Sequence, residues 1–392
     1  MKTTKSLYLQ GKNCSVSFPS PTGDSIGPQT KEKNTMFDIA VIGAGPAGAT
    51  FARLMAGQGL NILLLDGQEE HNSKPCGGLL APDAQKALAH FDLVLPKSIL
   101  VDPQIFSVKT IDVARRKIRY YSRHYLNIDR YAFDRWLVSL VPGTVEKRKG
   151  RCLKLERESE GFRLLVSGEG KKDWIQARQL VGADGANSLV RKNFFDHPVK
   201  HYVAIQQWYR NTGADAPFYS CVFDEETSES CSWSICKDGS FIFGGCFAPE
   251  GCREAFERQK KRLANYLGFD FSRCIKTEAC LALRPRRLRD FQTGKDGVYL
   301  IGEAAGFISP SSFEGISSAI LSGSMLAEAF LEGGTAERTA ARYRRKTAHL
   351  RVKLALKMGK RWFMYTPLVR SWIMRTGIGS IDVWPSGTEA GQ

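Results

Sequence analysis

Three glycines at positions 43, 45 and 48 have the spacing of a turn that binds a dinucleotide. An apolar run at 37–42, typical of a buried parallel strand, precedes this turn, and small and apolar residues at 47–55 predict a helix after it. Gly43 permits the tight turn, Gly45 lets the backbone approach a pyrophosphate, and Gly48 permits close packing of helix on strand. We therefore expect phosphates at the helix N-terminus. The residues expected to contact them are Gly43, Gly45, Pro46, Ala47 and Gly48.

An acidic residue stands where such a turn requires one. Residues 61–65 predict a second buried strand, and Asp66 follows it directly. The carboxylate of Asp66 is placed to accept hydrogen bonds from ribose hydroxyls. A purely structural glycine turn is the alternative, but the flanking strands and helix favour a nucleotide site.

Two later segments also follow predicted strands, at 182–188 (Gly-Ala-Asp-Gly-Ala-Asn-Ser) and at 302–310 (Gly-Glu-Ala-Ala-Gly-Phe-Ile-Ser-Pro). With the first turn, they resemble the FAD enzymes that include p-hydroxybenzoate hydroxylase and the geranylgeranyl reductases. The resemblance implies an FAD cofactor contacted by Asp184, Gly185 and Glu303, although the family more often has Asp at the last of these positions. It also implies that Arg130 reaches the FAD phosphates, for which a guanidinium is well suited. A surface arginine at a helix start is the alternative.

Residues 74–80 (Lys-Pro-Cys-Gly-Gly-Leu-Leu) narrow the resemblance to the geranylgeranyl reductases. It implies that Lys74, Cys76 and Gly77 lie beside the cofactor. The segment 233–245 resembles the strand that lines the isoprenoid pocket in those enzymes, but Cys231, Ile235 and Cys236 replace the usual Tyr, Phe and Pro. Within the family the sequence most resembles the bacterial flavoproteins called colicin M resistance proteins. The expected pocket residues are Trp233, Ile235, Lys237 and Phe243.

Backbone N–H groups at the start of a further predicted helix complete the expected cofactor site. Gly315 and Ile316 lie at that start, where such groups stabilise negative charge on a reduced flavin. Cys76 is the one residue expected to act in catalysis, as a group that positions or protonates the substrate. A small residue that only fills space beside glycines is the alternative for Cys76.

The expected fold class is α/β for the nucleotide-binding part, and α+β when the inserted antiparallel sheet is included. A Rossmann-like FAD-binding domain of the p-hydroxybenzoate hydroxylase type carries an inserted antiparallel sheet and a helical C-terminal region. The expected parts are a flexible tail (1–35), three FAD-binding segments (36–99, 126–195 and 291–335), two substrate-domain segments (100–125 and 196–290) and a basic helical region (336–392).

Charge is concentrated near the C-terminus. The 392 residues carry a net charge of +16, and residues 336–375 contain 12 Lys and Arg against the single acid Glu337. This pattern suits a polyanionic partner, which can be nucleic acid, anionic lipid or a phosphorylated substrate. With the family resemblance, we expect an anionic membrane surface or a substrate diphosphate and no nucleic acid. Tyr343, Leu350, Leu354 and Met358 recur at helical spacing, so an amphipathic helix packed on the FAD domain is the alternative.

Several classes of protein are excluded. No apolar run reaches the roughly 18 residues of a membrane-spanning helix, and residues 1–35 lack the apolar segment of a secretory signal. The ten cysteines are scattered, and neither they nor the six histidines have the spacing of metal ligands. We expect a cytoplasmic protein, either free or at the inner face of the membrane, with reduced thiols and no metal.

The leading functional hypothesis is an FAD-dependent reductase of carbon–carbon double bonds in a prenyl lipid or another hydrophobic small molecule. A second dinucleotide fingerprint is missing from the sequence, so NAD(P)H or a ferredoxin-like protein remain open as electron donors. The alternatives are a flavin monooxygenase that uses NADPH and O₂, and a non-catalytic flavin- and lipid-binding protein at a membrane surface.

Overall fold

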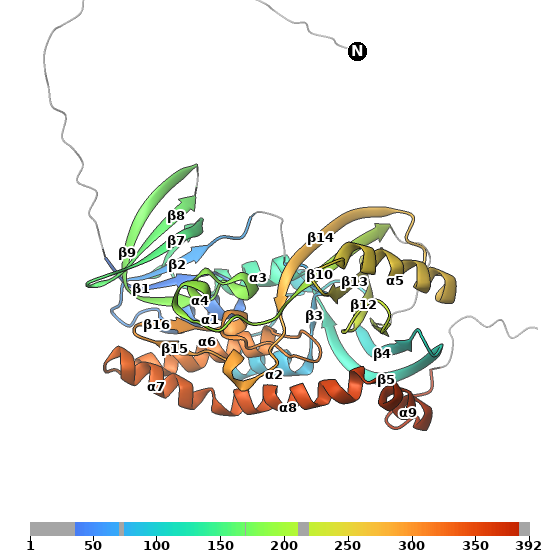
Figure 1. The fold of residues 1–392 in the computed structure, drawn as a ribbon. Coiled ribbons are helices and arrows are strands. Elements are labelled where there is room, and N and C mark those ends of the chain that lie inside the picture. The colour runs from blue at the N-terminus through green and yellow to red at the C-terminus, as the bar shows by residue number, and fades with distance from the viewer. Residues whose placement is uncertain (1–35, 70–73, 169, 211–218, 384–392) are drawn as a thin grey trace, which may run out of the picture. The chain divides into compact units, whose positions relative to one another are not determined.

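The computed structural model describes residues 36–69, 74–168, 170–210 and 219–383. The tail expected over residues 1–35 therefore lies outside the described residues. The strands of the described chain form two sheets, and helices pack against both (Figure 1). The boundaries expected between FAD-binding and substrate segments stay a prediction.

The first sheet contains the nucleotide-binding elements. Its order is β15-β16-β9-β1-β2-β6, and the five strands from β16 to β6 run parallel. An antiparallel hairpin of β7 and β8 extends β9. The strands are β1 (Phe37–Ile42), β2 (Ile62–Asp66), β6 (Glu146–Lys149), β7 (Arg151–Glu158), β8 (Gly161–Gly168), β9 (Lys171–Gly182), β15 (Gly294–Lys295) and β16 (Val298–Leu300).

The second sheet is the expected antiparallel insertion, with the order β14-β10-β13-β12-β11-β4-β5-β3. Every neighbouring pair in it is antiparallel except β11 and β4. Helix α5 (Cys252–Leu267) packs its apolar side on this sheet (Figure 1). The strands are β3 (Leu79–Leu80), β4 (Ile105–Asp112), β5 (Lys117–Asn127), β10 (His201–Arg210), β11 (Tyr219–Phe223), β12 (Ser232–Lys237), β13 (Ser240–Phe247) and β14 (Cys274–Leu283).

Several of the other helices begin at signals that are visible in the sequence. Pro46 and Pro82 stand at the first positions of α1 and α2, where proline fits because its missing N–H is not needed there. The Asp129 side chain accepts a hydrogen bond from the Ala132 N–H and so caps α3. These helices are α1 (Pro46–Met55), α2 (Pro82–His90), α3 (Arg130–Ser139), α4 (Leu189–Phe194), α6 (Ile316–Leu331), α7 (Ala336–Lys346), α8 (Ala348–Tyr365) and α9 (Pro367–Thr376).

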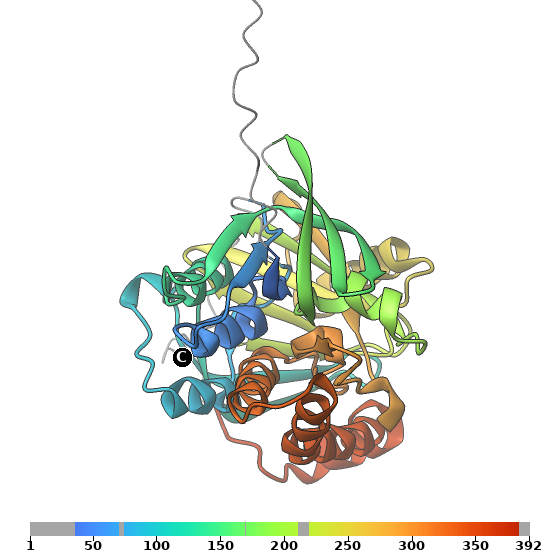
Figure 2. The same cartoon turned by 90° about the vertical axis from the view of Figure 1, so that its left-hand side faces the viewer.

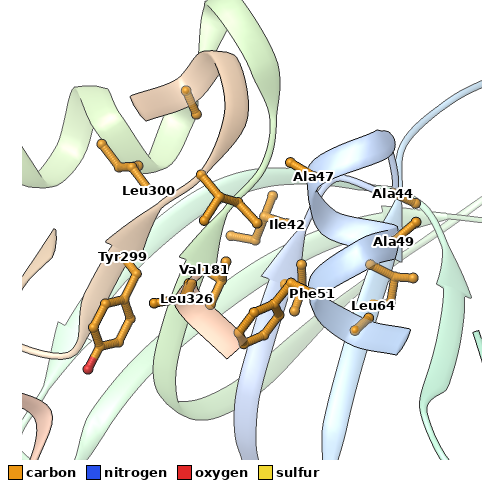
Figure 3. Packing of buried hydrophobic residues seen from close by; sticks show 14 of the residues in the cluster. Ile42, Ala44, Ala47, Ala49, Phe51, Leu64, Val181, Tyr299, Leu300 and Leu326 are labelled. Atoms are coloured by element: carbon orange, nitrogen blue, oxygen red, sulfur yellow. The ribbon is translucent and has the colours of Figure 1, made fainter. Parts of the chain in front are cut away.

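Helices α1 and α6 pack together against the parallel sheet. Phe51 of α1 and Leu326 of α6 are fully buried against Val181 and Leu300 of the sheet (Figure 3). A Cβ atom on Gly323 of α6 would lie 2.5 Å from the backbone oxygen of Ala47. The two helices therefore need a glycine at this crossing.

The C-terminal helices α7 and α8 lie on the opposite side of the described chain from the β7–β8 hairpin (Figures 1 and 2). Tyr343, Leu350 and Leu354 are buried in the main core, and the Tyr343 hydroxyl donates to the Leu300 carbonyl over 2.9 Å. These side chains of α7 and α8 therefore pack on the core that contains the parallel sheet. Among the described residues, no helix is long and apolar enough to cross a bilayer.

Candidate functional site

The register of the parallel sheet brings the three glycine-containing turns together. Ile42 of β1 and Leu300 of β16 both lie opposite Gly182 of β9. The Ala183 N–H donates to the Ile42 carbonyl over 2.8 Å, and the Ile301 N–H donates to the Gly182 carbonyl over 3.0 Å. Because parallel strands end at the same edge of a sheet, segments about 140 and 120 residues apart meet there.

The glycines of the first turn differ in what surrounds them. A Cβ on Gly43 would lie 2.5 Å from the Ala183 oxygen, and one on Gly48 would lie 1.9 Å from the Gly43 oxygen. Gly43 also has a φ of +108°, which favours glycine. A Cβ on Gly45, in contrast, would meet no atom within 4 Å. Gly45 lines a pocket, described below. The backbone at Gly45 therefore leaves room for a ligand.

One pocket of about 780 Å³ joins the two sheets. This volume is in the upper part of the 300–1,000 Å³ range typical of ligand sites. At one end it contacts the glycine turns, and at the other it contacts strands of the antiparallel sheet. The predicted site residues that line it are Gly43, Gly45, Pro46, Ala47, Asp66, Lys74, Cys76, Gly77, Arg130, Asp184, Gly185, Trp233, Ile235, Glu303, Gly315 and Ile316.

Two helix N-termini border this pocket. Gly45 precedes α1 and Gly315 precedes α6, and neither helix has a side-chain cap for its first N–H groups. Such groups carry partial positive charge and hydrogen-bond anionic ligands. The start of α1 is therefore suited to a pyrophosphate, and the start of α6 is suited to an anionic ring edge.

Asp66 is held by basic side chains at the pocket wall. Its Oδ2 lies 2.5 Å from Arg135 Nη1 and 2.6 Å from Lys149 Nζ, and its Oδ1 accepts from the Gln68 N–H over 3.1 Å. Burial alone raises the pKa of Asp66, but these partners outweigh it and the pKa is lowered. Asp66 is thus an ionised acceptor, and its contact with a ribose stays a prediction.

Asp184 provides the direct test of whether a ligand fits the second turn. Its Oδ2 accepts from the Leu189 N–H over 2.7 Å, whereas its Oδ1 is buried without a hydrogen-bond partner among the described residues. Burial raises the pKa of Asp184, opposed by the hydrogen bonds that it accepts. A buried acceptor without a donor is costly, so a ligand hydroxyl beside Oδ1 would relieve it. The turn fits the hydroxylated part of a dinucleotide.

Glu303, in the third turn, is engaged within the protein. Its Oε1 accepts from the Leu283 N–H over 2.9 Å, and its Oε2 pairs with the Lys74 ammonium. Burial lowers the pKa of Lys74, but the Glu303 charge outweighs it and the pKa is raised. This pair links the Lys74–Cys76 segment to the FAD-binding edge. A direct contact of Glu303 with the cofactor requires that it share its oxygens with these partners.

Arg130 and Cys76 lie together at the pocket wall. Arg130 Nε donates to Asp134 Oδ1 over 3.1 Å, and its guanidinium lies beside the Cys76 thiol. Burial lowers the pKa of Arg130, but Asp134 and Cys76 outweigh it, so the pKa is raised. The Gly78 N–H donates to Cys76 Sγ over 3.4 Å. Arg130 is therefore a fixed cation at the pocket wall rather than an exposed surface arginine.

Trp233 and Ile235 define the sheet end of the pocket. The Trp233 indole N–H donates to Gln206 Oε1 over 3.1 Å, which fixes the ring. A Cβ on Gly77 would lie 2.7 Å from Ile235 Cδ1, and one on Gly244 would lie 2.7 Å from the indole ring. The glycines at these positions therefore make room for the two side chains that narrow the pocket.

The other two predicted pocket residues do not line it. Lys237 shares the face of Trp233 and Ile235 but lies beyond the pocket, where Nζ donates to Asn127 Oδ1 over 2.5 Å and to the Ile128 carbonyl over 2.7 Å. Phe243 of β13 pairs with Ser234 of β12. Ser234 lies between Trp233 and Ile235, so its side chain points to the opposite face of the sheet from theirs, because successive side chains alternate. Phe243 points to the same face as Ser234 and so away from the pocket. There its ring stacks on Phe256, with centroids 5.5 Å apart.

The structure adds two residues that the sequence analysis missed. The Tyr125 hydroxyl donates to Glu314 Oε1 over 3.1 Å, and both residues line the pocket. Burial raises the pKa of Tyr125, so the phenol stays neutral. The one sequence signal for Glu314 is its position directly before Gly315. Within the described chain, no group of three or more potential ligands is placed to hold a metal.

The sequence of this chain is similar to that of known bacterial proteins. Protein CbrA of Escherichia coli O6:H1 (strain CFT073) is 46% identical over 351 residues, which cover 88% of this chain and 94% of that protein. The chain belongs to the CbrA family. CbrA of Shigella sonnei (strain Ss046) is likewise 46% identical, with 98% of its length covered. No protein-family model matches the sequence. The predicted family membership is confirmed.

Solved structures show that this CbrA-family chain has a flavoenzyme fold. A geranylgeranyl bacteriochlorophyll reductase-like protein from Thermoplasma acidophilum superposes with a TM-score of 0.73, at 17% identity over 84% of this chain and 88% of that one. PqsL, a probable FAD-dependent monooxygenase from Pseudomonas aeruginosa, gives 0.63 at 17% identity, over 88% and 100%. At these identities the likeness establishes the fold, and the predicted fold class is confirmed.

Proposed function

We propose that this CbrA-family protein is an FAD-dependent oxidoreductase that reduces carbon–carbon double bonds of a prenyl lipid. The observation that carries the proposal is the continuous pocket of about 780 Å³, which contacts three glycine turns at one end and Trp233 and Ile235 at the other. A nucleotide cofactor and an apolar substrate can therefore meet in one continuous pocket. FAD supplies the hydride when it is bound and reduced.

The polar end of the pocket binds the cofactor in this proposal. The N–H groups at the start of α1 hold the pyrophosphate, and the ionised Asp66 accepts from the ribose. Asp184 Oδ1 accepts from a hydroxyl of the ribityl chain. The N–H groups at the start of α6, at Gly315, would stabilise negative charge on the reduced ring.

The apolar end of the pocket orients the substrate. Trp233 and Ile235 narrow it, while Ala204 and Ala282 leave space beside them. Exclusion of water matters because an isolated alkene is a poor hydride acceptor that must be held in alignment. Cys76 donates the proton to the second alkene carbon, and the neighbouring Arg130 stabilises the thiolate that remains.

The source of electrons and the place of action complete the proposal. NAD(P)H or a ferredoxin-like protein reduces the flavin, and the protein acts in the cytoplasm, where it meets its lipid at the inner face of the membrane.

Anaerobic turnover tests the proposal. The flavin is reduced with dithionite, candidate prenyl diphosphates are added, and reoxidation is followed by absorbance together with mass analysis of the lipid. Reoxidation with a mass gain of two hydrogens supports reduction. A flavin that no prenyl lipid reoxidises would contradict it, and would favour a protein that binds lipid without converting it.

A second candidate is a flavin monooxygenase, favoured by the similarity to PqsL over the whole length of that chain. It shares the fold and all the turns described above. NADPH oxidation that consumes O₂ and adds oxygen to the product would favour this function. Product formation in the absence of O₂ would exclude it.

A further inference from the structure

Helices α8 and α9 present a row of large apolar side chains outward, away from the core. Leu350 and Leu354 fill the inner face of α8. On other faces of the two helices, large side chains are 52–77% exposed. The outer surface, as we call it, comprises Val352, Leu356, Phe363, Leu368 and Trp372.

The spacing of the outer surface makes it continuous along each helix. Val352, Leu356 and Phe363 are separated by four and seven residues, and Leu368 and Trp372 by four. Residues at these intervals share one helix face. Helix α8 is therefore apolar on a second face besides the one in the core, which an ordinary surface helix is not.

Basic side chains surround these apolar residues. Residues 336–375 contain 12 Lys and Arg and one acid. Acids of other elements form ion pairs with five of the twelve, Arg342, Lys346, Lys353, Lys357 and Arg370, so the region stays basic but carries less free charge than the sequence count suggests. Lys360 of α8 and Arg375 of α9 are exposed, and neither pairs with an acidic side chain in the part of the chain that the structure describes. Exposed cations beside large apolar and indole side chains are the combination that binds an anionic bilayer surface.

We propose that the outer surface of α8 and α9 docks on an anionic lipid bilayer, with its apolar side chains at the level of the headgroups. Charge decides between a bilayer and a second copy of the chain. Two copies joined through this region would bring two strongly basic segments together, and their repulsion opposes such a dimer. Anionic headgroups neutralise the same charges.

The docking surface lies beside the pocket. Lys357 of α8 lines the pocket, while Leu356, the preceding residue, points into solvent and is 72% exposed. A bilayer against the outer surface would therefore be separated from the pocket by the width of one helix. The inference rests on the proposed function for its placement at a membrane, but docking itself depends on the outer surface alone and not on the reaction.

Vesicle co-sedimentation with the full chain tests the proposal. The probes are phosphatidylcholine vesicles with and without phosphatidylglycerol. We expect binding to the anionic vesicles that weakens as salt is raised, and much weaker binding to the neutral ones. Leu356→Ser and Phe363→Ser should each weaken binding about tenfold or more, because each removes a large apolar side chain from the interface.

Matched variants separate docking from general effects. Ile275→Ser removes an apolar side chain that is 55% exposed on β14. β14 is one edge strand of the second sheet, whereas α9 packs on β5 near the other edge. This variant is therefore far from the outer surface and should bind like the wild type. Lys360→Glu should weaken binding, whereas Lys172→Glu on β9 should not.

Two further readouts keep the proposal open to refutation. Hydrogen exchange should show new protection confined to α8 and α9 when anionic vesicles are added. Wild-type protein that stays in the supernatant, or Leu356→Ser that sediments as the wild type does, would overturn the proposal. A dimer in sedimentation velocity that Leu356→Ser dissociates would assign the surface to a second copy instead.

Discussion

Replacing Gly45 with alanine separates the fold of the first turn from its binding of a dinucleotide. The backbone of Gly45 has φ −70° and ψ −174°, which alanine adopts without strain. The new Cβ would meet no protein atom within 4 Å. It would instead occupy pocket space before the first turn of α1, where we place the pyrophosphate. The variant should therefore fold normally and bind FAD more weakly.

The size of the two effects follows from general magnitudes. One methyl group forced into a filled site costs about 1–3 kcal/mol, which corresponds to an increase of about 5- to 150-fold in the Kd for FAD. The free energy of unfolding without FAD should change by less than about 1 kcal/mol. Alanine lowers the entropy of the unfolded chain but is a poorer N-cap than glycine, and the two effects oppose each other.

Titration of the cofactor-free proteins measures both quantities. Quenching of flavin fluorescence gives the Kd, and urea unfolding without FAD gives the stability. Gly48→Ala is the control for a disrupted turn, since its Cβ would lie 1.9 Å from the Gly43 oxygen and should lower stability by itself. A Gly45→Ala protein of normal stability whose Kd for FAD equals that of the wild type would refute the placement of the pyrophosphate.

Three other variants test separate parts of the site and fold. The pKa of Asp66 is below its unfolded value of about 3.9, so the stability it provides is present above that pH and lost as pH falls through the folded pKa. Wild type should therefore lose more stability than Asp66→Asn between neutral pH and pH about 3 in urea unfolding; equal losses would exclude the pairing. Tyr343→Phe removes the buried hydrogen bond to the Leu300 carbonyl and should cost about 1–2 kcal/mol in the same assay, and an unchanged midpoint would contradict that bond. Cys76→Ala should keep the flavin spectrum but lower anaerobic reoxidation by about 10²- to 10⁴-fold, and an unchanged rate would remove its role as proton donor.

Local patterns were sufficient to predict the nucleotide-binding elements. The apolar run and the glycine spacing predicted a helix over residues 47–55, and α1 spans Pro46–Met55. The three turns meet because parallel strands end at one edge, which element order and resemblance together anticipated. These features depend on neighbours in sequence or on a common topology, and both are legible without coordinates.

Side-chain partners across long separations were not predictable. Lys74 and Glu303 are 229 residues apart, and nothing local indicates that they pair. The same holds for Asp66 and Arg135. The face of Phe243 was misjudged because β13 is buried on both faces, so the successive apolar residues Phe241, Ile242 and Phe243 show no alternation that would distinguish the pocket side.

The C-terminal helices show a third limit. Tyr343, Leu350 and Leu354 have helical spacing and are all buried in the main core, but Tyr343 lies on α7 and the two leucines lie on α8, so the helix expected over these residues is two helices. The second apolar row, on Leu356 and Phe363, was not separated from the first, because a hydrophobic pattern does not show which of two faces the core occupies. Burial in the folded chain resolves them.

The flavin content of the purified full-length protein tests the central claim most directly. After reconstitution with FAD and removal of the excess, absorbance near the flavin bands should correspond to one flavin per chain, and chromatography of the released cofactor should identify it as FAD. Protein that is colourless and retains no FAD after reconstitution would contradict the claim that the three turns form one flavin site.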